Sequence, residues 1–173
     1  MTQTHDLALR PRVPQLSPSV ELQGSLASRV ADISSFVDRL TKFLKPLVDE
    51  FGKEDGSDVE IEIAVREAIA NAVIHGNHEN PQKRVYVTCR CSMEGEVQIT
   101  VRDEGQGFDS RAVPDPRDEI NLLLTHGRGL LLMQTLMDEV GFQENGTVVR
   151  MRKLLRRPNC SSLDMGGGHD CLE

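Results

Sequence analysis

The sequence predicts an α/β (α+β) two-layer sandwich, in which helices cover one face of a mixed, mostly antiparallel sheet. Two long stretches have the apolar period of a helix, and two pairs of short stretches alternate as strands do. The predicted order is strand, helix, helix, two strands, loop, helix, two strands. Runs of antiparallel strands combined with apolar helices favour a sheet that is covered on one side.

The composition is that of a globular domain whose core consists of aliphatic side chains. The 173 residues are 38% hydrophobic but only 3% aromatic, so Val, Ile, Leu and Met must fill the core. The net charge of −7 argues against a general nucleic-acid binder, because such proteins carry a basic surface. No apolar run approaches a membrane span and the N-terminus lacks a signal-peptide core, so we expect a cytoplasmic protein.

We expect one domain over residues 19–155, between a flexible arm (1–18) and a disordered tail (156–173). The arm contains three prolines and shows no period, and the tail has no core pattern. An edge strand is predicted over 19–24 and a helix over 26–48. The apolar stripe of this helix consists of Leu26, Val30, Ile33, Val37, Leu40 and Leu44.

A second helix is predicted over 59–75, with Ser57 or Asp58 as its cap and Gly76 at its end. The stretches RVYVTCRC and EGEVQITVRD then alternate, which predicts an antiparallel hairpin with one buried face. The inward residues are Val85, Val87, Cys89 and Cys91 on one strand and Val97, Ile99, Val101 and Asp103 on the other. The two cysteines are therefore expected to be small core residues.

The last third of the chain begins with a glycine-rich break, DEGQGFD. The stretch SRAVPDPRDEINLLLTH contains two prolines and is expected to form a mobile loop or a partly helical lid. GRGLLLMQTLMDEV predicts a helix that starts with glycines. GFQENGTVVRMRKLL predicts a second hairpin, with Asn145 and Gly146 as its two-residue turn.

Glu67 and Asn71 are unexpected in the second helix, which is apolar nearly all round and therefore buried. The two residues are four apart and share one face. In a structural interpretation, Glu67 reaches the helix edge or pairs with an arginine such as Arg66 or Arg84. In a functional interpretation, Glu67 is a general base beside a metal-binding amide, because Mg²⁺ prefers oxygen ligands and a carboxylate accepts protons.

Asp103 and two pairs of glycines are the other candidates. Asp103 either caps its own turn or accepts a hydrogen bond from a ligand, such as an exocyclic amine. In the second case Gly105 and Gly107 would let the backbone approach a flat ring. Gly127 and Gly129 precede the last helix, where backbone N–H groups form an anion site, although paired glycines also serve as a flexible start to a helix.

Taken together, these stretches resemble the motifs of a known family. EAIANAVIHGN, VRDEGQGFD and GRGLLLMQTLMDEV follow one another as in the ATP-binding domain shared by gyrase, heat-shock protein 90, histidine kinases and MutL. This domain has the histidine-kinase-like ATPase (Bergerat) fold. The segment from 57 to 155 is most similar to the anti-sigma-factor serine/threonine kinases of bacterial partner-switching systems.

The resemblance implies a role for each matching residue. Glu67 would be the catalytic general base, Asn71 would hold Mg²⁺, and Asp103 would accept a hydrogen bond from the adenine amine. The other ATP-binding residues that it implies are Gly105 and Gly107 around the adenine, Gly127, Arg128, Gly129 and Leu130 along the phosphates, and Thr147 as the strand threonine that supports the adenine–aspartate contact.

The resemblance implies an ATP- and Mg²⁺-dependent kinase that phosphorylates a serine on a small antagonist protein. Its implied partners are this antagonist, a sigma factor that it sequesters and a second copy of the chain, with no direct nucleic acid and no membrane. A sensor histidine kinase is disfavoured because the helix over 26–48 contains no histidine. A non-catalytic module that binds ATP or ADP and sequesters a protein partner stays open as the alternative, because a family resemblance is not an activity.

Overall fold

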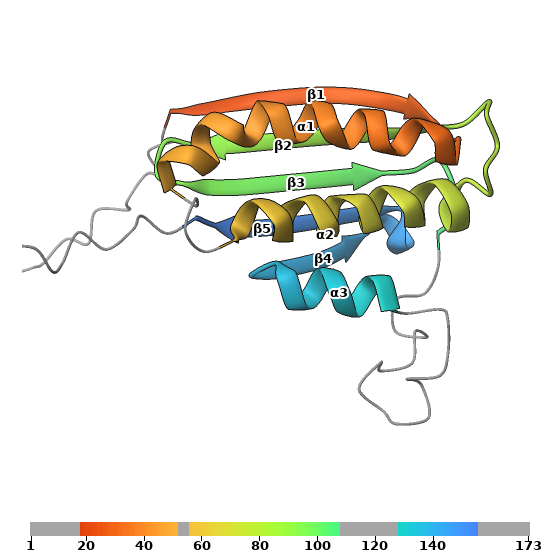
Figure 1. Ribbon diagram of the computed structural model, residues 1–173. Helices are drawn as coiled ribbons and strands as arrows, with labels where there is room; N and C mark the ends of the chain where they lie inside the picture. The colour runs from red at the N-terminus through yellow and green to blue at the C-terminus, as the bar shows by residue number, and fades with distance from the viewer. Residues whose placement is uncertain (1–17, 52–55, 108–127, 156–173) are drawn as a thin grey trace, which may run out of the picture.

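The computed structural model describes residues 18–51, 56–107 and 128–155, and they form two layers. Figure 1 shows the helices on one face of a five-stranded sheet, as the sequence predicts. The elements in chain order are β1 (Ser19–Ala27), α1 (Val30–Phe51), α2 (Ser57–Asn71) with a π-helical turn (Ala72–Gly76), β2 (Arg84–Ser92), β3 (Glu96–Arg102), α3 (Arg128–Leu136), β4 (Glu139–Gln143), a 3₁₀ turn (Glu144–Gly146) and β5 (Val148–Leu154).

Three sequence predictions lie outside the described residues. They are the arm before residue 18, the tail after residue 155 and the loop or lid within 108–127. The proposed limits of the domain therefore stay a prediction.

The strand order is β1-β2-β3-β5-β4, and every pairing in the described part of the chain is antiparallel. The expectation of a mixed sheet is therefore wrong. Two helices connect β1 to β2, and the three reversals of the chain along this path make β2 antiparallel to β1. Among the described residues, α3 lies between β3 and β4 in the chain. These two strands run parallel, and β5 lies between them in the sheet.

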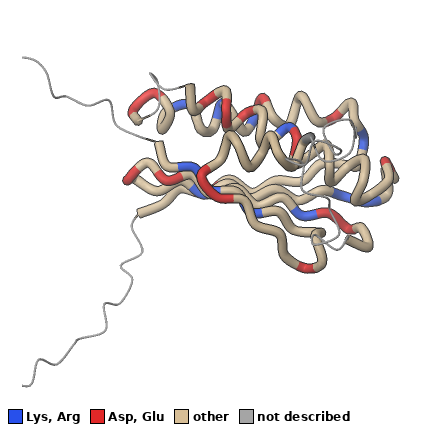
Figure 2. The backbone as a smooth tube through the Cα atoms, turned by 90° about the horizontal axis from the view of Figure 1, so that it is seen from below, with Lys and Arg blue, Asp and Glu red and all other residues tan. Residues whose placement is uncertain are grey.

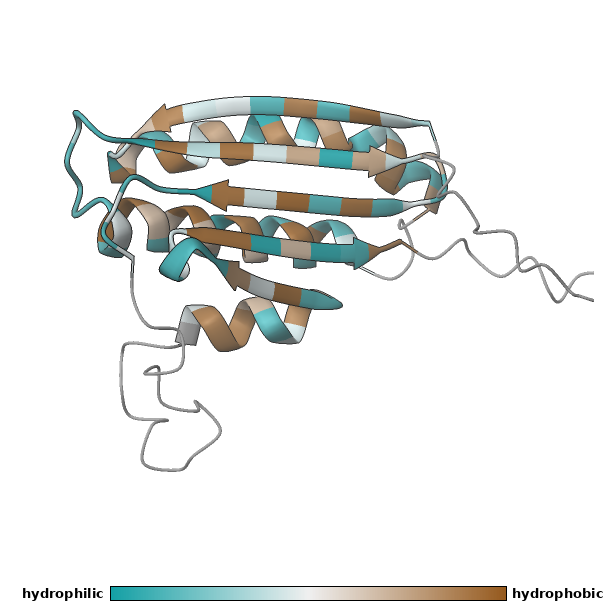
Figure 3. Ribbon diagram, turned by 180° about the vertical axis from the view of Figure 1, so that it is seen from behind, coloured by the Kyte–Doolittle hydropathy of each residue, from teal (hydrophilic) through white to brown (hydrophobic). Residues whose placement is uncertain are grey.

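The core lies between the helices and the inner face of the sheet. Val37 of α1, Ile69 of α2 and Ile99 of β3 are each no more than 1% exposed. Figure 3 shows the alternation of hydropathy along the strands that places every second side chain in this core. Cys89 and Cys91 are buried as predicted, with their Sγ atoms 3.9 Å apart.

Three predicted boundaries differ from the structure. The N-cap of α2 is Gly56 rather than Ser57 or Asp58. Leu26 belongs to β1, where it pairs with Val85, so α1 begins only at Val30. The helix predicted through Val140 ends at Leu136, because Asp138 already donates its N–H to the Arg152 carbonyl of β5 (3.0 Å). The apolar periods of α1 and α3 continue into the neighbouring strands, so the sequence alone extends both helices too far.

The predicted two-residue turn is also wrong. Gln143 pairs with Val148, which leaves four residues in the connection. Glu144 and Asn145 both have a positive φ, of 49° and 53°. The hairpin from β4 to β5 therefore turns through a short 3₁₀ segment rather than through Asn145 and Gly146 alone.

Both ends of the described chain lie at the turn between β2 and β3. The Pro18 carbonyl accepts a hydrogen bond from the Met93 N–H (3.1 Å), and the Leu155 N–H donates to the Gly95 carbonyl (2.9 Å). Asp103 follows the opposite end of β3. Pro18 and Leu155 therefore lie at the end of the sheet away from Asp103 (Figure 1).

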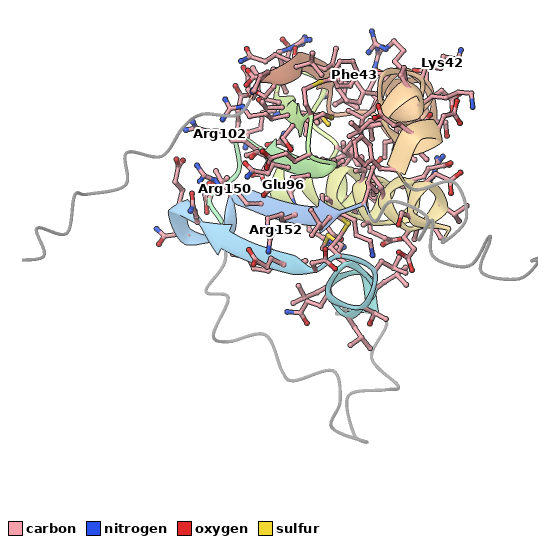
Figure 4. All side chains as sticks on the ribbon, turned by 90° about the vertical axis from the view of Figure 1, so that its left-hand side faces the viewer. Lys42, Phe43, Glu96, Arg102, Arg150 and Arg152 are labelled. Carbon is pink, nitrogen blue, oxygen red and sulfur yellow. The ribbon has the colours of Figure 1, made fainter. Side chains whose placement is uncertain are left out.

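The outer face of the sheet is polar. Figure 4 shows Arg102, Arg150 and Arg152 with Glu96 over the strands, on the side away from the helices. Arg152 pairs with Glu139 (2.6 Å) in one of several ion pairs across this face, and Figure 2 shows both signs of charge distributed along the chain. Exposed pairs of this kind contribute little to stability. None of the described helices is long and apolar enough to cross a membrane.

Candidate functional site

Glu67 and Asn71 lie one turn apart near the end of α2, and the first turn of α3 packs against them. Both side chains are half-buried. A Cβ at Gly129 would lie 2.7 Å from Oε2 of Glu67 and 3.4 Å from Nδ2 of Asn71. The structure thus brings two of the predicted motifs together, and only glycine fits at position 129 without a shift of these side chains.

The arginines that the structural interpretation offered to Glu67 are bound elsewhere. Arg66 donates to Oε1 of Glu62 (2.9 Å) and to Oγ of Ser34 (3.1 Å). Arg84 donates to Oγ of Ser25 (2.8 Å). The structure therefore shows no ion pair between Glu67 and either of these two arginines. Within the described residues, Glu67 makes no ion pair or hydrogen bond, so its carboxylate can accept a proton from a bound molecule.

Asp103 sits half-buried just beyond β3, as the alternation predicts. Its Oδ1 accepts a hydrogen bond from the Gly105 N–H (2.7 Å), so the aspartate does cap its own turn. Its backbone N–H donates to the Thr147 carbonyl (3.0 Å). Burial raises the pKa of the Asp103 carboxyl, although the Gly105 N–H and the charge of Lys83 act in the opposite direction. Oδ2 accepts no hydrogen bond from the described residues.

The glycine loop after Asp103 packs directly on two other backbone segments. A Cβ at Gly105 would lie 2.3 Å from the Gly76 carbonyl oxygen, and one at Gly107 would lie 2.1 Å from the Asn145 carbonyl oxygen. Gly107 also has a φ of 75°, a conformation that side chains disfavour. Glycine is therefore required here for space, and at Gly107 for the backbone conformation too.

Thr147 is placed near Asp103, but not as expected. It lies in the turn one residue before β5, and its hydroxyl donates to the Glu144 carbonyl (2.9 Å). Its backbone carbonyl, rather than its hydroxyl, holds Asp103. Its role in supporting the adenine–aspartate contact through water stays a prediction.

The other predicted phosphate residues surround the start of α3. Arg128 is the first residue of this helix, and Leu130 is half-buried against the core. Gly127 lies outside the described residues. The first turn of α3 packs against Glu67 and Asn71. This placement fits the predicted anion site, because backbone N–H groups at a helix start favour negative charge.

A hollow of about 570 Å³ opens beside Asp103. Its lining consists of Tyr86, Arg102, Asp103, Glu104, Gly105 and Thr147. A second groove, of about 200 Å³, lies between α1 and α2 and contains none of the predicted residues. Tyr86 and Arg102 belong to the outer face of the sheet, so this hollow opens beside the Asp103 loop on the side away from the helices.

Two residues of the site escaped the sequence analysis. Gly76 was predicted only as the end of a helix, but a Cβ there would lie 2.5 Å from Cγ of Asp103. Glu104 had no predicted role, yet its carboxylate accepts hydrogen bonds from the Arg84 N–H (2.8 Å) and the Tyr86 hydroxyl (3.0 Å). No local pattern marks either residue, because both act through contacts between distant segments.

This site could hold a magnesium ion only together with bound phosphates, because the described residues supply few ligands. No group of three or more His, Cys, Asp and Glu gathers among the described residues. The half-buried amide of Asn71 offers one oxygen towards the start of α3. Magnesium commonly takes one or two protein ligands and completes its shell with phosphate and water, so one amide beside an anion site suits it.

A family model agrees with this geometry. The model described as a histidine kinase-like ATPase domain matches residues 27–153. This range includes Glu67, Asn71, Asp103 and the start of α3.

Named relatives share the same region. The anti-sigma F factor of Heyndrickxia coagulans is 41% identical over 100 residues, which cover 55% of this chain and 68% of that protein. The anti-sigma F factor of Oceanobacillus iheyensis is 33% identical over 137 residues, covering 75% and 84%. The serine-protein kinase RsbW of Staphylococcus aureus is 30% identical over 136 residues, covering 75% and 86%.

A solved structure shows the same fold. The crystal structure of the RsbU and RsbW domains of a Mycobacterium tuberculosis protein matches with a TM-score of 0.54 at 18% identity. The match covers 81% of this chain and 33% of that one. The chain described here therefore spans about a third of that longer protein, and the likeness concerns the fold alone.

Proposed function

This chain belongs to the family of histidine kinase-like ATPase domains, and we propose that it is an ATP-dependent serine/threonine protein kinase of the anti-sigma-factor type. The observation that carries the proposal is the face shared by Glu67 and Asn71, closed by the glycine start of α3. A relative of this chain is named a serine-protein kinase and others are named anti-sigma factors. A carboxylate that has no partner among the described residues, beside an amide and a helix start, suits phosphoryl transfer.

In this proposal, the adenine lies against the half-buried carboxylate of Asp103. Oδ2 of Asp103 accepts a hydrogen bond from the exocyclic amine, while Oδ1 stays bound to the Gly105 N–H. Gly105 and Gly107 let the loop pack closely on the backbone of Gly76 and Asn145, and this packing holds the loop in place beside the adenine. Guanine presents a carbonyl where adenine has its amine, so an ionised Asp103 selects adenine.

The phosphates then lie between α2 and the first turn of α3. The backbone of Gly127, Arg128, Gly129 and Leu130 supplies N–H groups to them, and the Asn71 amide oxygen holds Mg²⁺. The ion supplies charge neutralisation on the phosphate oxygens when it is bound. Asn71 and the helix start thereby fix the terminal phosphate next to Glu67.

Glu67 acts as the general base. A serine hydroxyl of the protein substrate attacks the terminal phosphorus, its proton passes to the Glu67 carboxylate, and the bond from phosphorus to the ADP oxygen breaks. The products are phosphoserine and ADP. The contribution of the chain to this step is to position the reactants and to accept one proton.

The proposed protein partners are a small antagonist that carries the serine and a sigma factor that the kinase sequesters. A homodimer and a cytoplasmic location belong to the same proposal. The names of the relatives support the sigma-factor partner.

Titration calorimetry with ATP, ADP and GTP, each with and without Mg²⁺, tests the nucleotide site. We expect adenine-selective binding that Mg²⁺ strengthens for ATP, and Asn71→Ala should remove the effect of Mg²⁺.

Phosphorylation of purified candidate antagonists, each with and without its serine, then tests the reaction. Glu67→Gln should bind ATP but transfer no phosphate; transfer at the wild-type rate would contradict the base assignment. Tight nucleotide binding with no transfer to any candidate would favour a non-catalytic binding module.

A further inference from the structure

Asn77 is one of the few polar residues that the structure buries completely. Its side chain and backbone together are 1% exposed. It follows the π-helical turn that ends α2, and its backbone N–H donates to the Ala72 carbonyl (2.8 Å). This wide turn carries Asn77 inwards, although polar residues on both sides of it in the sequence are exposed. Turns of this kind are frequent at functional sites.

The Asn77 amide satisfies its hydrogen bonds with three different parts of the chain. Nδ2 donates to Oγ of Ser28 (2.8 Å) and to the Arg84 carbonyl (2.9 Å). Oδ1 accepts from the Glu104 N–H (2.9 Å). These partners lie between β1 and α1, at the start of β2 and after β3. A buried amide is costly unless it is paired in this way, so the four segments hold one geometry.

This network joins the two halves of the candidate site. On one side, Asn77 continues the helix that carries Glu67 and Asn71. On the other side, its Oδ1 holds the residue next to Asp103. The carboxylate of Glu104 fixes the same segment to β2 through the Arg84 N–H. The position of Asp103 relative to α2 is therefore set largely through Asn77.

The backbone after Asn77 is strained. His78 and Glu79 have φ values of 55° and 53°, which are unfavourable for residues other than glycine. Such conformations persist where surrounding contacts impose them. The buried hydrogen bonds of Asn77 are the contacts that anchor this turn to the rest of the molecule.

We propose that Asn77 is a positioning residue that aligns the adenine-reading carboxylate of Asp103 with the helix that bears Glu67 and Asn71. The inference rests on the proposed function, because it assigns Asn77 a role in nucleotide selectivity. Asn77 touches no nucleotide itself. It acts through the Glu104 N–H, and without it the Asp103 loop loses this side-chain hydrogen bond to the segment that follows α2.

Asn77→Ala tests the inference, with Asn80→Ala as its matched control. Asn80 is exposed in the same turn, and its Oδ1 accepts only the nearby Gln82 N–H (3.0 Å) among the described residues. Titration calorimetry gives the dissociation constants for ATP and GTP, at a temperature where circular dichroism shows each variant to be folded. We expect Asn77→Ala to weaken ATP binding about tenfold and to narrow the preference for ATP over GTP, whereas Asn80→Ala changes neither.

A merely structural role would lower the melting temperature and leave the ATP/GTP ratio unchanged, and that result overturns the inference. If Asn77→Ala does not fold, Asn77→Ser, which keeps a short polar group, gives the same comparison; an unchanged ratio there also overturns it. A wild-type protein that binds neither nucleotide, or both equally, overturns the proposed function and this inference with it. A selective wild type with an equally selective variant overturns the inference alone.

Discussion

Between α1, α2 and the sheet, large side chains fill the space, whereas at the far end of α2 the closest contacts are made by residues without side chains. Leu40 and Ile69 are no more than 1% exposed in the first region. In the second, a Cβ at Gly76, Gly105 or Gly107 would lie within 2.5 Å of a neighbouring atom. The core thus depends on large side chains that fill it, and the candidate site depends on glycines that leave room for neighbouring atoms.

This difference predicts which substitutions each region tolerates. A core position that loses atoms leaves a cavity that its neighbours fill only in part. A site position that gains one atom must displace a carbonyl or a carboxylate. Large-to-small substitutions should therefore damage the first region, and small-to-large substitutions the second.

Ile69→Ala should give the largest loss of stability. Ile69 is completely buried in α2, so its truncation should lower the free energy of unfolding by about 2–5 kcal/mol. Urea denaturation followed by circular dichroism measures this change. A loss below about 1 kcal/mol would mean that the core collapses around the cavity and that the two regions differ less than their packing suggests.

Gly107→Ala should affect stability less but abolish adenine-selective binding. The new Cβ meets the Asn145 carbonyl and the φ of 75° disfavours a side chain, which together cost about 1–3 kcal/mol. Gly141→Ala is the control, because a Cβ there has no neighbour within 4 Å. Calorimetry with ADP and thermal melting should separate the two variants; equal behaviour would contradict the role of the missing side chain.

The protonation of Asp103 should link ADP binding to pH. Burial raises the pKa of this carboxyl in the free protein, and a hydrogen bond from the adenine amine would lower it again by favouring the ionised form. Affinity for ADP should therefore rise with pH up to the raised pKa and stay constant above it. Because the folded pKa is raised, ionisation of Asp103 should also reduce stability as pH increases through that value.

Carbon-13 NMR of the Asp103 carboxyl, with and without ADP, measures this shift directly. Asp103→Asn is the control, since an amide does not titrate and its ADP affinity should not follow this pH dependence. A carboxyl whose pKa is unchanged by ADP would show that the adenine does not reach Asp103.

Lys45→Ala should have the smallest effect. Lys45 pairs with Asp49 one turn further along α1, but the two side chains are 69% and 42% exposed. Exposed pairs at this spacing contribute about 0.3–0.5 kcal/mol. Urea denaturation should show a change near that size, and a loss above about 1 kcal/mol would mean that the helix surface contributes to stability as the core does.

The sequence predicted the elements of this fold better than their limits. Alternation located β2 and β3 because one face of each strand is buried and the other is not. Periodicity also assigned Leu26 to a helix, because its spacing from Val30 fits a helical stripe as well as the strand in which it lies. Val140 was assigned to a helix for the same reason, and pairing with β5 decides its true state.

The candidate site was predictable only where a residue broke a local pattern. Glu67 and Asn71 are polar in an apolar helix, and Asp103 is acidic on an inward face, so each could be found. Asn77 lies in a polar stretch, and its burial depends on Ser28 and Arg84 far away in the chain. The role of such a residue cannot be predicted without the three-dimensional contacts that its amide makes.

The turn between β2 and β3 lies at the end of the molecule that is best suited to attachment to a surface. Pro18 and Leu155, the first and last described residues, are both hydrogen-bonded to this turn, at the opposite end of β3 from Asp103. A biotin tag or a fluorescent fusion on either flank would therefore anchor the protein by the end remote from the candidate pocket. Immobilised in this way on a sensor chip, the chain would present the pocket to solution whichever terminus is attached.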